Sequence, residues 1–97
     1  MVQEEEILVE PKLEPRYRVL IHNDDVTPID FVMLVLIRFF KLNAMEAERI
    51  TLTAHHSGVA QVAILPKAVA HERVGRAHFA AGVEGYPLTF TIEPVES

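Results

Sequence analysis

The sequence contains no cysteine. Without thiols the chain cannot form a disulfide framework, a thiolate metal site or a cysteine nucleophile. Nothing therefore argues for an oxidising compartment, and a cytosolic setting fits the composition best. Serine is also scarce, because Ser57 and Ser97 are the only two, so nucleophilic acyl transfer has few candidate groups. We expect a protein that is not an enzyme.

Long hydrophobic runs and basic patches are missing as well. The longest apolar stretch, residues 29–37, is interrupted by Asp30 and followed by Arg38, whereas a membrane helix needs about 20 apolar residues. The net charge is -5, and there is no basic stripe of the kind that binds phosphate backbones. We expect neither a membrane nor a nucleic acid as a partner.

The composition predicts one domain preceded by a tail. An apolar share of 49% over 97 residues is sufficient for a single compact core. Residues 1–16 differ from the rest, because they contain five glutamates, two prolines and few side chains to bury. We interpret residues 1–16 as a flexible acidic tail without a targeting signal, and residues 17–97 as the domain.

Three segments have the pattern of β-strands. In residues 17–23 the aromatic and β-branched side chains alternate with the others, which is typical of a half-buried strand: Tyr17, Val19 and Ile21 fall on one side and Arg18, Leu20 and His22 on the other. Residues 59–65 are apolar, rich in β-branched side chains and followed by Pro66, and we interpret them as a strand well inside the sheet. Residues 88–93 alternate again and form the last predicted strand.

The first predicted helix is unusually apolar. Thr27 and Asp30 resemble a capping box around Pro28, which predicts a helix from Pro28 to about Phe40. Almost every side chain of this segment is apolar, which is more than one buried stripe would use. Either part of the helix faces a ligand or partner, or the helix is central and covered on both sides.

Two further helices complete the predicted fold. Asn43 and Glu46 have the spacing of an N-terminal cap, and Gly58 can end that helix in the left-handed conformation. After the second strand, small residues recur at helical spacing from Ala70 to Ala81 and predict a third helix that lies close to the sheet. The order β-α-α-β-α-β predicts a single-domain α+β fold, with three helices on one face of a small three-stranded antiparallel sheet.

The histidines and neighbouring aspartates are weak candidates for chemistry. Imidazoles are good zinc ligands, but the spacing of the five histidines matches no compact ligand motif. They are His22, His55, His56, His71 and His78. We interpret them as solvated or capping side chains and expect neither a metal nor a cofactor. Asp24 and Asp25 lie in a polar turn, where backbone hydrogen bonding is a more ordinary role than acid–base catalysis.

Three motifs carry a resemblance to a known family. They are NDD-x-TP followed by a hydrophobic helix ending in Arg-Phe-Phe (residues 23–40), a histidine before a glycine turn (54–58), and Tyr-Pro-Leu (86–88). Together they resemble the ClpS family of Clp protease adaptors. The resemblance implies a protein that binds others beginning with Leu, Phe, Tyr or Trp through their free α-amino group. It further implies delivery to a ClpA-type AAA+ unfoldase for degradation by the Clp protease.

The resemblance also implies which residues form the binding site. Asn23 would accept from the amino group through its amide oxygen, Asp25 directly or through water, and His55 through an unprotonated ring nitrogen, with Asp24 as a further candidate. A free α-ammonium has three donors and a charge, so it requires several converging acceptors. The hydrophobic pocket for the first side chain would be formed by Thr27, Pro28, Ile29, Val32, Thr51 and Leu88.

Some positions depart from the family's pattern. Ile29 and Thr51 stand where the family usually has pocket methionines. Ile29 is a stiff β-branched side chain that cannot adapt to a ligand as a thioether can, and Thr51 adds a hydroxyl and removes volume. We expect a cavity that is wider at its floor and stricter at its rim, with Leu and Phe preferred. The unfoldase-facing surface would include Ala68 and Arg73, where the family has an acidic and a basic residue.

A second interpretation keeps the fold without the binding site. The C-terminal domain of the ribosomal stalk protein has the same α+β layout and serves as a protein-docking module. In that case the polar acceptors would be incidental. A third class, a metal-dependent hydrolase, would use the histidines. We expect a monomer in the bacterial cytosol, with a mature plastid protein as the alternative.

Overall fold

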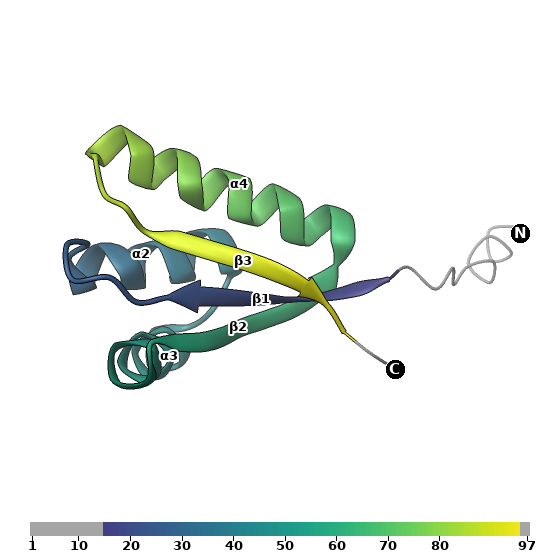
Figure 1. Cartoon of the computed structure of the whole chain (residues 1–97), viewed down its shortest axis with the longest axis horizontal. Coiled ribbons are helices and arrows are strands. Elements are labelled where there is room, and N and C mark those ends of the chain that lie inside the picture. Colours follow the sequence, from purple (N-terminus) through teal and green to yellow (C-terminus); the bar gives the residue numbers. More distant parts are fainter. Residues whose placement is uncertain (1–14, 96–97) are drawn as a thin grey trace, which may run out of the picture.

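The computed structural model describes residues 15–95, and its elements follow the expected order. They are β1 (Arg16–His22), α2 (Ile29–Phe40), α3 (Ala44–Ser57), β2 (Val59–Pro66), α4 (Lys67–Glu84) and β3 (Thr89–Pro94), as drawn in Figure 1. The predicted tail lies outside the described residues except for its last two. Arg16 already belongs to β1, so the first strand begins one residue before the predicted Tyr17.

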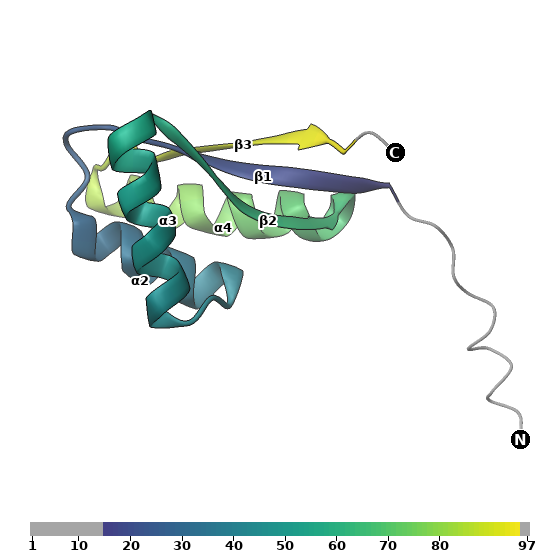
Figure 2. The ribbon, with the colours of Figure 1, turned by 90° about the horizontal axis from the view of Figure 1, so that it is seen from below.

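The three helices lie together on one face of an antiparallel sheet (Figure 2). The α+β class and the order of the elements are therefore as predicted. The strand order is β2-β1-β3, so β2 is an edge strand and its predicted place well inside the sheet is wrong. Because helices cover only one face, every strand buries alternate residues, and an apolar run does not reveal which strand is hydrogen-bonded on both sides. In β2, Ala60 and Val62 are buried whereas Val59 and Gln61 are exposed.

The start of α2 differs from the predicted capping box. Pro28 is the N-cap of α2 rather than its first residue, and no side chain caps the helix. The hydroxyl of Thr27 instead donates to Asp24 Oδ2 at 2.9 Å. The predicted capping box between Thr27 and Asp30 is therefore wrong, because the threonine hydroxyl donates to the turn before the helix and not to the helix itself.

Both predicted ends of the second helix are confirmed. Asn43 Oδ1 accepts from the Glu46 backbone N–H at 2.8 Å, and Glu46 Oε1 accepts from the Asn43 backbone N–H at 3.0 Å. This reciprocal pair satisfies two of the donors that a helix N-terminus leaves free. At the other end Gly58 adopts φ 91° and closes α3 in the left-handed conformation.

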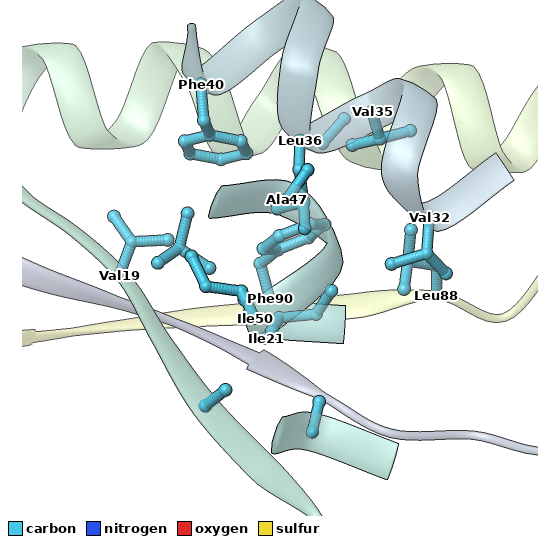
Figure 3. Close-up of a cluster of buried hydrophobic side chains, with 14 of the residues drawn as sticks. Val19, Ile21, Val32, Val35, Leu36, Phe40, Ala47, Ile50, Leu88 and Phe90 are labelled. Carbon is cyan, nitrogen blue, oxygen red and sulfur yellow. The ribbon is translucent and has the colours of Figure 1, made fainter. Parts of the chain in front are cut away.

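The core lies between the sheet and the helices (Figure 3). Val19 and Ile21 of β1 and Leu36 of α2 are at most 1% exposed. Phe40 stacks on Phe90 with ring centroids 5.2 Å apart, which joins the end of α2 to β3. Each large buried side chain contributes about 1.5–3 kcal/mol, so this layer holds α2 against the sheet.

The opposite side of α2 is open to solvent. Leu34 and Ile37 are 51% and 39% exposed, so α2 is not covered on both sides. The excess of apolar residues in this helix therefore serves more than the core.

The longest helix, α4, packs through small side chains as predicted. Ala70, Ala77 and Ala81 are at most 1% exposed and bring α4 close to the sheet. His78 Nε2 accepts from the Phe90 backbone N–H at 2.9 Å, so α4 also binds the outer edge of β3. Among residues 15–95, no helix combines the length and the hydropathy needed to cross a membrane.

Candidate functional site

A cavity of about 200 Å³ opens where the end of β1, the start of α2, the end of α3 and the segment before β3 meet. Every residue that the sequence implied for amino-group binding or for the pocket lines this cavity, except Pro28. Pro28 is half-buried at the N-cap of α2. The lining residues implied beforehand are Asn23, Asp24, Asp25, Thr27, Ile29, Val32, Thr51, His55 and Leu88.

The polar rim is built from two turns that are distant in the sequence. Asn23 and Asp25 follow β1, and His55 lies in the last turn of α3; all three are exposed. The Asn23 backbone N–H donates to the Gly58 carbonyl at 3.0 Å, and this bond extends the β1–β2 ladder by one residue. Because Gly58 immediately follows α3, the bond holds the last turn of α3, which contains His55, beside the turn formed by residues 23–25.

Beneath this rim the cavity wall is apolar and largely shielded from solvent. Thr27, Val32, Thr51 and Leu88 are all between 5% and 8% exposed, and Figure 3 shows Val32 and Leu88 side by side. Ile29 is 51% exposed and also lines the cavity, so it lies at the mouth rather than the floor. The site combines hydrogen-bond acceptors at its rim with an apolar interior.

The hydroxyl of Thr51 is already hydrogen-bonded within its own helix. Thr51 Oγ1 donates to the Ala47 carbonyl at 2.7 Å. The hydroxyl proton is therefore not available to a ligand, although the side chain lines the cavity. The sequence indicated an added hydroxyl at this position but could not show where its proton goes.

Asp24 organises the turn that leads into α2. Its Oδ1 accepts from the backbone N–H groups of Val26 and Thr27 at 2.8 and 2.7 Å, and its Oδ2 accepts from the Thr27 hydroxyl at 2.9 Å. Partial burial acts to raise the pKa of Asp24, but the three hydrogen bonds outweigh it and hold the pKa below its ordinary value of 3.8. Asp24 is thus a positioning residue, whereas its neighbour Asp25 is exposed at the rim.

Three residues that line the cavity were not among those that the sequence implied for the site. They are Ile21, His22 and Ala54. Ile21 and Ala54 are buried at positions where the strand and helix periodicities predict core residues, and periodicity does not separate a core wall from a cavity wall. The His22 ring nitrogen Nε2 lies 2.7 Å from Thr91 Oγ1 across the sheet.

The residues implied for the unfoldase surface lie apart from the cavity. Ala68 is exposed and Arg73 is half-buried, both in the first half of α4, and neither lines the cavity. Within residues 15–95, no three His, Cys, Asp or Glu side chains lie close enough together to hold a metal ion.

The chain matches known proteins over most of its length. The family model described as ATP-dependent Clp protease adaptor protein ClpS matches residues 12–91. The ATP-dependent Clp protease adapter protein ClpS 2 of Mesorhizobium japonicum is 49% identical over 89% of this chain and 82% of its own length. The adapter protein ClpS of Nitratidesulfovibrio vulgaris is 44% identical over 93% and 92%.

A solved structure has the same fold. Agrobacterium tumefaciens ClpS2 bound to L-phenylalaninamide superimposes with a TM-score of 0.81 at 34% sequence identity. The similarity covers 84% of this chain and 99% of that one.

The hydrogen bonds of Asp24 predict a pH-dependent contribution to stability. Because its pKa is lowered in the folded state, the contribution is complete above the unfolded-state pKa and is lost as pH falls through the folded-state pKa. Asp24→Asn should lower the free energy of unfolding at pH 7 by about 0.5–1.5 kcal/mol. In urea titrations at several pH values, the gap between the two proteins should narrow below pH ~4.

Asp25→Asn is the matched control, because this neighbouring carboxylate is exposed. It should change the free energy of unfolding little at any pH. A gap for Asp24→Asn that stays constant from neutral to acidic pH would contradict the assignment.

Proposed function

The chain belongs to the ClpS family of ATP-dependent Clp protease adaptors, and on this premise we propose that it binds other proteins by a hydrophobic N-terminal residue with a free α-amino group. The relatives are named adapter proteins of the Clp protease, and the protein is an adaptor rather than an enzyme. The observation that carries the proposal is the joining of a polar rim to an apolar cavity of about 200 Å³.

The proposal assigns the rim to the α-amino group. Asn23 supplies its amide oxygen and His55 a ring nitrogen as acceptors, and Asp25 supplies the negative charge that a free ammonium requires. The bond between Asn23 N–H and the Gly58 carbonyl sets these side chains on adjoining turns. Acetylation would remove the charge and two donors from the ligand, so acceptors on the rim would lose their partners.

The cavity is assigned to the first side chain of the substrate. Burial of a Leu or Phe side chain is worth about 1.5–3 kcal/mol relative to exposure. The L-phenylalaninamide bound by Agrobacterium tumefaciens ClpS2 combines a free amino group with an apolar side chain, which is the chemistry that a rim and cavity of this kind would recognise. This neighbour supports the proposal at 34% identity.

Delivery to a ClpA-type AAA+ unfoldase is the second part of the proposal. Family membership makes a Clp protease the destination. We assign the contact with the unfoldase to the surface of α4 around Ala68 and Arg73, which leaves the cavity free to hold a substrate at the same time.

Peptide binding tests the first part. In fluorescence anisotropy, labelled peptides beginning with Leu or Phe should bind ten- to a hundredfold more tightly than one beginning with Ala, as the burial energies imply. Acetyl-Leu peptide should bind about 5- to 150-fold more weakly than its free counterpart, because unpaired acceptors cost about 1–3 kcal/mol. Equal, weak binding to all four peptides would refute recognition of the chain terminus.

Asp25→Ala should abolish tight peptide binding while the circular dichroism spectrum stays unchanged, because Asp25 is exposed. Asp30→Ala is the control: this carboxylate lies in the first turn of α2, is also exposed and does not line the cavity. Loss of binding in both variants would indicate a general effect of charge rather than a rim contact.

Thr51 tests the volume of the cavity. Thr51→Met adds volume to the wall, so it should weaken a peptide beginning with Trp more than one beginning with Leu. Thr51→Val keeps the volume and removes a hydroxyl whose proton is bound to the Ala47 carbonyl, so it should leave the ratio of the two Kd values unchanged. A ratio that shifts with Val and not with Met would contradict the placement of Thr51.

Unfoldase binding tests the second part. Immobilised ClpA-type unfoldase should retain the chain, and Arg73→Glu should reduce retention. Arg49→Glu is the matched control, because this exposed residue lies on α3. In a second experiment the chain itself is immobilised and exposed to a lysate. If it retained translation factors instead of the unfoldase, the stalk-like docking module would be favoured and delivery would be overturned.

A further inference from the structure

A separate groove lies between the end of α2 and the middle of α4. It consists of two hollows of about 450 and 210 Å³. Phe39, Glu72 and Arg76 line both hollows, so the two adjoin and form one surface, the α2–α4 groove. None of its lining residues belongs to the candidate site.

One part of the α2–α4 groove is apolar and open to solvent. Phe79 lines it and is 75% exposed, and Val83, one helical turn further along α4, is 68% exposed. Gly75 contributes no side chain to the wall between Phe39 and Phe79. An aromatic side chain so exposed beside a hollow is typical of an interaction surface.

The other part of the groove is basic. Four of the nine lysines and arginines of a chain with net charge -5 line this hollow. They are Arg38, Lys41, Arg73 and Arg76. Glu72 is the single acid among the lining residues, and it forms an exposed ion pair with Arg76 at 3.3 Å. The groove therefore suits a segment that is acidic and also carries a few apolar side chains.

The sequence of this chain contains such a segment. Residues 4–10 read Glu-Glu-Glu-Ile-Leu-Val-Glu, with four carboxylates around three consecutive apolar side chains. We propose that residues 4–10 dock in the α2–α4 groove of the same molecule, with the apolar triplet against Phe79 and Glu10 among the four cations.

The point where the described chain begins places this segment within reach. The Lys67 backbone N–H donates to the Pro15 carbonyl at 3.1 Å, so the segment enters the domain at the first residue of α4. Arg76 lies nine residues along α4, about 14 Å at 1.5 Å per residue. Residues 10–14 can span up to about 16 Å when extended, so Glu10 can reach the cations and the apolar triplet can reach beyond them.

The short connection makes a weak contact sufficient. Exposed ion pairs contribute little individually, but a segment tethered this closely has an effective concentration in the mM range. Docking would cover Arg73, so the tail would compete with the unfoldase for this surface. That consequence rests on the proposed function, whereas docking itself does not.

A spin label can detect the docked segment directly. Because the chain contains no cysteine, Gln3→Cys accepts a single nitroxide, and amide intensities of the ¹⁵N-labelled protein report its surroundings. At about 20 mM salt, intensities of residues 71–80 should fall at least about twofold, given a local concentration in the mM range. Residues 44–57 of α3 should stay unaffected, and the loss should fade at about 500 mM salt, where charges are screened within a few ångströms.

Variants on both sides of the contact provide the controls. Replacement of Glu4, Glu5, Glu6 and Glu10 by Gln in one variant, and separately Arg76→Glu, should restore the intensities, whereas Arg49→Glu on α3 should not. Uniform intensity loss over the surface, or none, would overturn the proposal. A last control mixes ¹⁵N-labelled protein without the nitroxide and unlabelled protein with it. The same pattern of intensity loss in this mixture would also overturn the proposal, because the groove would then be occupied by a second copy.

Discussion

The candidate site depends on a hydrogen bond that joins two distant parts of the chain. The Asn23 N–H donates to the Gly58 carbonyl at 3.0 Å, one residue beyond the last pair of the β1–β2 ladder. Asn23 is followed by Asp24 and Asp25, and Gly58 is preceded by the last turn of α3, which contains His55. The bond continues the ladder as far as the rim, so the acceptors lie on adjoining turns and a ligand need not order two separate loops at its own cost.

Two neighbouring aspartates differ in their hydrogen bonds and in their exposure to solvent. Asp24 is bound by three donors of Val26 and Thr27, which lowers its pKa and shapes the entry into α2. Asp25 remains exposed at the rim. One carboxylate thus orders the turn and the other stays exposed, where the proposed function assigns it to the ligand; this division follows from the turn geometry rather than from the identity of the residues.

The surplus of apolar residues in α2 serves three surfaces. Leu36 is buried in the core, Val32 lines the cavity, and Phe39 lines the α2–α4 groove. The helix therefore contributes side chains to the core and to both candidate binding surfaces. The stacking of Phe40 on Phe90 joins the end of this helix to β3.

The sequence by itself determined the features that depend on neighbours along the chain. The Asn43–Glu46 cap, the left-handed Gly58 and the small-residue face of α4 are local, so spacing and residue type sufficed to predict them. The motifs around Asn23 and His55 also indicated the site residues through family resemblance. Only the tertiary structure decided that β2 lies at an edge and that the predicted pocket residues other than Pro28 surround one cavity. These features depend on pairing partners distant in sequence, and the alternation of apolar and polar residues is the same whichever partner is chosen.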